Sequence, residues 1–110
     1  DDNKRQLDGY TKDVINPFSI EAKMKAFGFN TQTVKGNDLD AIDEAITKAK
    51  SVTDSAVCIV LDTIKGQGVK FFEELLDNHS VKFNTEEVNR ATDEAKASLK
   101  KEIEEEEQHV

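Results

Sequence analysis

An uncharged apolar run at residues 56–61 constrains the fold of this chain more than any other feature. The run has no polar side chain on either face, so a strand formed there must be covered on both sides. Such strands are typical of parallel sheets that carry helices on each face. The run therefore predicts an α/β protein, here a parallel-sheet fragment with crossover helices.

The segments before this run complete one crossover unit. Residues 31–34 are rich in β-branched side chains and predict a short strand that ends at Gly36. Asn37, with Asp40 in capping-box spacing, predicts a helix between the two strands. A strand, a helix and a parallel strand form a right-handed unit. Because two strands are too few for a stable sheet of this class, we expect further strands upstream. The helix has an apolar face made of Leu39, Ile42, Ala45, Ile46 and Ala49.

Two more helices are predicted. Asn16 followed by Pro17 predicts a helix start, and Gly28 predicts its end. The last helix is expected from residue 84 to about 107, with Asn84 and Glu87 as its capping box. Residues from about 104 to 110 form an acidic tail that we expect to fray, and residues 1–110 are taken as one partial domain. The apolar positions of the two helices are Ile20, Met24 and Phe27, and Val88, Ala91, Ala95, Leu99 and Ile103.

Composition excludes several classes of protein. The net charge of −8, from 15 basic and 23 acidic side chains, argues against nucleic-acid binding and against attachment to anionic lipid. The longest apolar run is far too short to span a membrane. The single cysteine, Cys58, excludes a disulfide framework and fits a reducing, cytoplasmic compartment. A chain that starts at Asp1 without a signal sequence is expected to be part of a longer protein or a processed product.

Three sites carry possible chemistry. Residues 1–3, Asp-Asp-Asn, offer oxygen donors for a hard cation such as Mg²⁺, or are simply a solvated terminus. Residues 65–68, Lys-Gly-Gln-Gly, follow the apolar strand and either approach a phosphate or form a plain loop. His79 could bind phosphate or transfer protons, or could be an ordinary surface residue. Cys58 is expected to be buried and inert.

The order of these motifs resembles the transketolase family. Residues 2–10, DNKRQLDGY, are similar to the end of the family's thiamine-diphosphate motif, with Asn3 as the second asparagine of its Asn-Asn pair and Asp2 in place of the first. Residues 20–29, 36–42 and 63–69 resemble the family patterns I-E-A-K-x-x-A-F-G-W, G-H-D-x-x-A-I and T-x-K-G-K-G-V. The likeness runs from Asp1 to about Leu99. It is strongest to the C-terminal part of the thiamine-diphosphate-binding domain in the N-terminal subunit of split transketolases.

The resemblance assigns roles to four residues. It implies that Asn3 ligates Mg²⁺ through its side-chain oxygen and that Arg5 does so through its backbone carbonyl. It implies that Leu7 packs on the cofactor's thiazolium and that His79 contacts the diphosphate. It assigns no catalytic residue to this chain. The family's Gly-Asp-Gly is absent, and Asn78 and Ser80 replace the tryptophan and glycine that flank the family histidine.

The function implied is transfer of a two-carbon ketol unit between sugar phosphates, with thiamine diphosphate and Mg²⁺ as cofactors. A C-terminal transketolase subunit or a second protomer would complete the site, and no nucleic acid or membrane takes part. Because both cofactors need residues outside this chain, we expect the isolated chain to be inactive. Three alternatives remain: a related thiamine-diphosphate enzyme with another substrate, a non-catalytic fragment or interaction module, and a phosphate-binding module that uses the Lys65 loop and His79.

Overall fold

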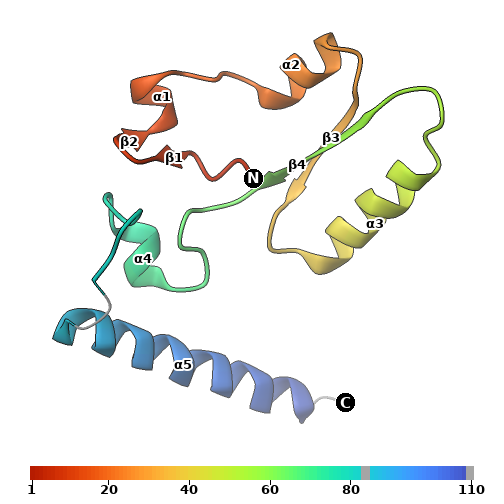
Figure 1. Cartoon of the computed structure of the whole chain (residues 1–110). Coiled ribbons are helices and arrows are strands. Elements are labelled where there is room, and N and C mark those ends of the chain that lie inside the picture. Colours follow the sequence, from red (N-terminus) through yellow and green to blue (C-terminus); the bar gives the residue numbers. More distant parts are fainter. Residues whose placement is uncertain (83–84, 109–110) are drawn as a thin grey trace. The chain divides into compact units, whose positions relative to one another are not determined.

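The computed structural model describes residues 1–82 and 85–108. The chain divides into two compact units, Asp1–Ile64 and Lys65–Val110, and each is described by itself. The first unit contains, in chain order, β1 (Arg5–Gln6), β2 (Gly9–Tyr10), α1 (Thr11–Val14), α2 (Ile20–Ala26), β3 (Asn30–Lys35), α3 (Leu39–Lys50) and β4 (Val57–Asp62) (Figure 1). The second unit contains α4 (Lys70–Glu74) and α5 (Glu86–Glu107).

A parallel strand pair, β3 and β4, forms the centre of the first unit. Its register runs from Asn30 beside Val57 to Lys35 beside Asp62, with α3 as the crossover helix, so the predicted unit is confirmed. Gln32 donates through Nε2 to the carbonyl of Ala45 on α3 (2.9 Å). The next residue, Thr33, donates to Glu21 on α2. Since successive side chains of a strand point to opposite faces, α2 and α3 cover opposite faces of the pair (Figure 1).

The other edge of β4 is paired at its carboxyl end by the start of the chain. Asp2 forms a parallel bridge to Asp62, in which the Asp2 N–H donates to the Leu61 carbonyl (2.8 Å) and the Thr63 N–H donates to the Asp2 carbonyl (3.3 Å). The expected second neighbour of the strand is thus present at this one position. The bridge places the residues after Asp2 beside the carboxyl end of β4.

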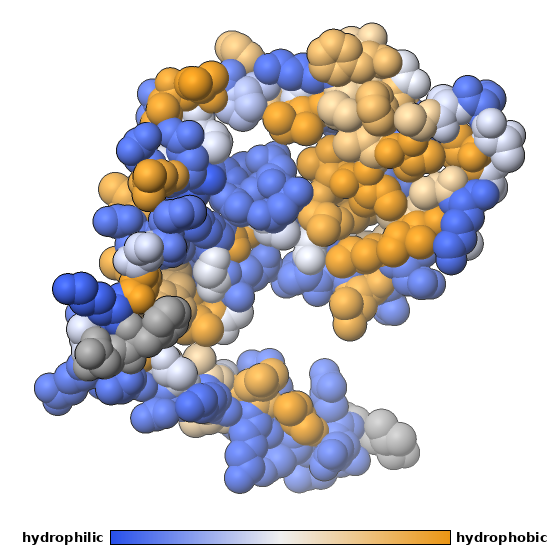
Figure 2. Space-filling model, in the orientation of Figure 1, coloured by the Kyte–Doolittle hydropathy of each residue, from blue (hydrophilic) through white to orange (hydrophobic). Residues whose placement is uncertain are grey.

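Burial is lower than the apolar run predicts. Val60, at 6% exposure, is the buried residue of β4. Thr31 on β3 and Ala45 on α3 are also buried. Cys58 is half-buried, which corrects the expectation of a buried thiol. The reason is that β4 has a full-length neighbour on one edge only among the described residues. Hydrophobic surface accordingly gathers over α2, β3, β4 and α3 (Figure 2).

Helix starts differ from the predicted ones because neighbouring residues compete for the cap. Ser19 caps α2 by accepting from the Ala22 N–H (3.1 Å), whereas Asn16 accepts from the Phe18 N–H and closes a turn around Pro17. On α3 the cap is Asp38 rather than Asn37. The prediction that Gly28 ends α2 is confirmed, since it adopts φ +89°, which favours glycine.

The last helix, α5, is capped by Thr85, which accepts from the Val88 N–H (3.3 Å). The predicted capping residue Asn84 lies outside the described residues. The helix continues to Glu107, so residues 104–107 of the expected frayed tail are helical. Of its predicted apolar positions Val88 is buried, whereas Leu99 and Ile103 are exposed. Within residues 1–82 and 85–108, no helix is both long and apolar enough to cross a membrane.

Glu21 ties α2 to the sheet and gives the first testable prediction. Its bonds to Lys25 and then Thr33 lower the pKa of its carboxyl from the ordinary 4.5. Glu21→Gln is therefore expected to reduce the free energy of unfolding at neutral pH. A carboxylate whose pKa is lower in the folded than in the unfolded protein stabilises the folded state at pH values above the unfolded pKa. This contribution is lost as the pH falls through the lowered, folded-state pKa.

The measurement is urea unfolding of both proteins at neutral pH and below the lowered pKa, where their difference should vanish. Glu44→Gln is the matched control, because the pKa of Glu44 is lowered by Lys48 on the same helix and involves no contact with the sheet. Equal losses in the two variants at neutral pH would contradict a role for the Thr33 contact.

Candidate functional site

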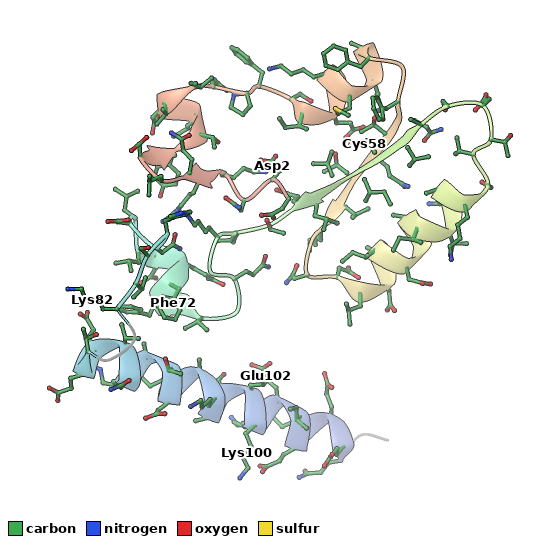
Figure 3. The ribbon with its side chains drawn as sticks, in the orientation of Figure 1. Asp2, Cys58, Phe72, Lys82, Lys100 and Glu102 are labelled. Carbon is green, nitrogen blue, oxygen red and sulfur yellow. The ribbon has the colours of Figure 1, made fainter. Side chains whose placement is uncertain are left out.

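The turn between Asn3 and Arg5 is the first part of the candidate site. The Asn3 side chain accepts through Oδ1 from the Arg5 N–H (3.0 Å) and donates through Nδ2 to Asp1 Oδ2 (2.6 Å). These two bonds fix the orientation of its amide oxygen. Asp2, just before it, lies beside the carboxyl end of β4 (Figure 3). Carboxyl ends of parallel strands are the usual place for ligands in open α/β sheets.

The backbone of Arg5 faces the same side as the Asn3 oxygen. Arg5 lies on β1, opposite Tyr10 on β2, and the Lys4 carbonyl before it accepts from the Thr11 N–H (2.9 Å) within the hairpin. Because successive peptide groups of a strand point in opposite directions, the Arg5 N–H and carbonyl point outward, where the N–H meets Asn3. An amide oxygen and a backbone carbonyl are thus directed to one side.

These two oxygens fit Mg²⁺ by their chemistry, since this ion prefers oxygen ligands. No group of three His, Cys, Asp or Glu side chains suited to a metal occurs in the parts of the chain that the structure describes. A metal here would need oxygens of the turn together with groups from elsewhere. Phosphate oxygens and water commonly supply the remaining ligands of Mg²⁺.

Leu7 lies at the tip of the β1–β2 hairpin. Leu7 is 62% exposed, so its apolar side chain is open to a ligand. The hairpin is stabilised by Arg5, whose guanidinium lies 4.8 Å from the Tyr10 ring centre and donates to its hydroxyl (3.2 Å). This hairpin was not predicted from the sequence, although Asp8-Gly9 is a known signal for one.

In the second unit, Lys65 and His79 come together. Lys65 Nζ lies 3.4 Å from His79 Nδ1, although the two residues are 14 positions apart in the chain. An ammonium group can only donate, so a hydrogen bond between the two requires Nδ1 to accept, which places the ring proton on Nε2. In that tautomer Nε2 is a hydrogen-bond donor, and the ammonium at Nδ1 adds positive charge. Both features suit an anionic ligand such as a phosphate.

Asn78 shapes the loop that carries this pair. Its Nδ2 donates to the carbonyls of Lys65 (3.2 Å) and Phe72 (2.7 Å). These two bonds join the loop of residues 65–68, here named the glycine loop, to α4. Its Oδ1 is buried without a hydrogen-bond partner among the described residues. Nothing in the sequence indicated this role for Asn78. A pocket of about 320 Å³ adjoins these residues and is lined by Gly66, Phe72, Asn78, His79, Ser80 and Val81.

Gly66 allows the glycine loop to approach α4 closely. It adopts φ +82°, and a Cβ atom placed there would lie 2.7 Å from the Cβ of Phe72 and 2.9 Å from its carbonyl carbon. Figure 3 labels Phe72 on α4. Gly68 adopts φ +96° with open space around it, and its N–H donates to Glu73 Oε1 (2.8 Å). The sequence allowed either a phosphate-approaching loop or a plain loop at residues 65–68. The structure shows a loop whose backbone packs closely against α4 at Gly66.

The predicted site residues thus form two groups. Asn3, Arg5 and Leu7 share one turn and hairpin in the first unit, and His79 lies with Lys65 in the second. The sequence offered the Lys65 loop and His79 together as a possible phosphate site, and the structure brings these two side chains within 3.4 Å.

Comparison with known proteins identifies the family. The family described as "Transketolase, thiamine diphosphate binding domain" matches residues 1–106. The 6-deoxy-6-sulfo-D-fructose transketolase subunit SqwG of Clostridium sp. is 43% identical over 103 residues, which are 93% of this chain and 36% of that protein. An apulose-4-phosphate transketolase subunit of Actinobacillus succinogenes is 30% identical over 96 residues, 87% of this chain and 34% of that protein.

The chain therefore spans about a third of the length of these two curated relatives. A transketolase of Nostoc sp. is 41% identical over 70 residues, 62% of this chain and 10% of that protein. No solved structure gives a significant match. The α/β architecture with its small parallel sheet agrees with these matches. The chain belongs to the transketolase family, within its thiamine-diphosphate-binding domain.

Proposed function

We propose that this domain holds the diphosphate of thiamine diphosphate through Mg²⁺, in a transketolase that transfers a two-carbon ketol unit between sugar phosphates. The Asn3–Arg5 turn carries the proposal, since it directs two oxygens to one side beside the carboxyl end of a parallel strand. The Asn3 Oδ1 atom and the Arg5 carbonyl would be two ligands of the metal. The cofactor's phosphates, water and other protein groups would complete its six-ligand shell.

The other residues bind and orient the cofactor. His79 would donate from Nε2 to a diphosphate oxygen, and Lys65 would add its positive charge while holding the imidazole in the donating tautomer. Leu7 would pack on the face of the thiazolium ring and exclude water from it. When bound, thiamine diphosphate itself supplies the carbanion stabilisation that ketol transfer requires. This chain's residues therefore act in binding rather than in the chemical steps.

The partner is proposed to be another transketolase chain. Two of the relatives are named as subunits, and we infer that a C-terminal subunit or a second protomer completes the site here too. Their printed names differ in the sugar, one carrying a sulfo group and one a phosphate. Both names place an acidic group on the sugar, so we propose sugar phosphates, or sugars with a similar anion, as substrates.

Replacement of His79 tests the diphosphate contact. In the transketolase that carries this domain, His79→Ala is expected to raise the thiamine-diphosphate Kd roughly 10- to 100-fold, because a hydrogen bond to a charged group is worth about 1.5–3 kcal/mol. His79→Gln, which retains a donor near the position of Nε2, should recover most of the affinity. The measurement is isothermal titration with thiamine diphosphate at saturating Mg²⁺.

The same titration tests the function as a whole. If binding of thiamine diphosphate by the unsubstituted enzyme does not depend on Mg²⁺, the proposed function is wrong, and a non-catalytic interaction module becomes the better interpretation. If binding depends on Mg²⁺ but His79→Ala binds as tightly as the unsubstituted protein, only the role of His79 is excluded.

A further inference from the structure

The turn that holds Asn3 and Arg5 is fastened to the end of β4 by four residues, here named the clasp: Asp2, Lys4, Asp62 and Thr63. The backbone of Asp2 bonds with Leu61 and Thr63 on either side of Asp62. The ammonium of Lys4 lies 2.6 Å from Asp2 Oδ2 and 2.7 Å from Asp62 Oδ1, and also donates to the Asp2 carbonyl (2.9 Å). One lysine thus joins the start of the turn to the end of the strand.

Lys4 also has a backbone conformation that lysine rarely adopts. Its φ is +64°, in the left-handed region that favours glycine and asparagine. Its carbonyl is held in place by two donors, the N–H (2.9 Å) and the Oγ1 (3.2 Å) of Thr11. A strained conformation persists only where several surrounding contacts require it. The conformation at Lys4 is what brings the Arg5 N–H back onto the Asn3 side chain, two residues earlier.

We propose that Lys4 is a positioning residue whose ammonium, by bridging Asp2 and Asp62, holds the oxygens of Asn3 and Arg5 in the arrangement that Mg²⁺ requires. This inference rests on the proposed function of the turn. Both ion pairs are partly exposed, so they contribute little to overall stability. Their effect is on the geometry of the turn, because Asn3 lies between the two residues that the clasp holds.

Electrostatics and positioning predict opposite results for Lys4, which makes the test decisive. A lysine ammonium repels a nearby cation, so its removal would by charge alone strengthen Mg²⁺ binding. Loss of a positioning contact would instead weaken it. Removal of the Asp62 carboxylate would, by charge alone, weaken Mg²⁺ binding, and loss of a positioning contact would weaken it as well. Only a positioning role predicts weaker metal binding for both substitutions.

The experiment measures the Mg²⁺ concentration that half-saturates binding of thiamine diphosphate, by titration of the transketolase that carries this domain. Lys4→Asn removes the ammonium but keeps a side chain suited to the left-handed backbone. We expect this half-saturating concentration to rise about tenfold, as for other contacts that orient metal ligands. Asp62→Asn should change it in the same direction, and Lys4→Arg should restore it to within about threefold.

Lys35→Asn is the control for charge, because Lys35 is exposed at the same end of the sheet and pairs in register with Asp62 through its backbone. It should leave the half-saturating concentration unchanged. A normal or lower Mg²⁺ requirement in Lys4→Asn would overturn the inference, as would an equal rise in Lys35→Asn. The thermal midpoint without metal should stay near that of the unsubstituted protein. If the unsubstituted enzyme shows no dependence on Mg²⁺, it is the proposed function that fails.

Discussion

Gly66→Ala is expected to destabilise the second unit and to weaken thiamine-diphosphate binding by up to about 100-fold, the limit set by loss of the His79 contact itself. A left-handed backbone costs a non-glycine residue about 1–2 kcal/mol. The new Cβ would also overlap the Cβ and backbone of Phe72, at 2.7 and 2.9 Å, which adds roughly 1–3 kcal/mol of overpacking. Relief of this overlap would displace the adjoining Lys65 from His79. Urea unfolding and cofactor titration measure the two effects.

Gly68→Ala is the matched control for this prediction. Gly68 has the same left-handed backbone, at φ +96°, but no atom lies within 4 Å of a Cβ placed there. Its alanine variant should therefore lose only the backbone contribution, about 1–2 kcal/mol, and should bind the cofactor more tightly than Gly66→Ala. Equal losses of stability and affinity in the two variants would contradict the close approach of Gly66 to Phe72.

Asn3→Ala is expected to weaken Mg²⁺ binding about as strongly as Gly66→Ala weakens cofactor binding. It removes a proposed Mg²⁺ ligand and the acceptor for the Arg5 N–H in one change, so both oxygens of the turn lose their arrangement. We expect the half-saturating Mg²⁺ concentration for cofactor binding to rise by about 100-fold, the upper end for loss of groups that orient or ligate a metal. Titration of thiamine diphosphate at a series of Mg²⁺ concentrations measures this change.

Asn3→Asp separates the ligand from the rest of the side chain. Aspartate keeps an oxygen for the metal and for the Arg5 N–H, but it loses the donor to Asp1 and places a second carboxylate beside it. Its variant should stay within about tenfold of the unsubstituted protein, since Mg²⁺ accepts carboxylate ligands readily. If alanine and aspartate at this position behave alike, Asn3 does not ligate the metal.

The parallel strands β3 and β4 and the helices α2, α3 and α5 were predictable, whereas the β1–β2 hairpin, α1, α4, the exact ends of the elements and their burial were not. Residues 56–61 indicated a parallel strand because no polar side chain interrupts them, and β4 confirms it. The caps at Ser19 and Asp38 were assigned to neighbours because Ser, Asp and Asn all suit that position. Burial of Cys58 and Leu39 depends on which elements pack above them, which the local pattern does not contain.

The candidate site was predictable where it is local in the chain. Asn3, Arg5 and Leu7 lie in one motif, so the resemblance alone placed them. The contact of Lys65 with His79 spans 14 positions, and no periodicity connects them. The role of Lys4 depends on Asp62, at the far end of the first unit's sequence, and on a left-handed backbone that its residue type does not favour. The role of Lys4 could not be read from spacing or residue type, and the sequence joined Lys65 to His79 only as a candidate phosphate site.

The charge of Asp62 has a second consequence, for aggregation. Residues 57–61 form an uncharged, β-branched segment, and one of its edges is paired by Asp2 at a single position among the described residues. Segments of this kind pair readily with copies of themselves while a chain is still being synthesised. Asp54 and Asp62 flank the segment closely, as gatekeeper charges do in many proteins. The carboxylate that anchors the turn through Lys4 is thus also one that keeps the nascent strand from associating with its neighbours.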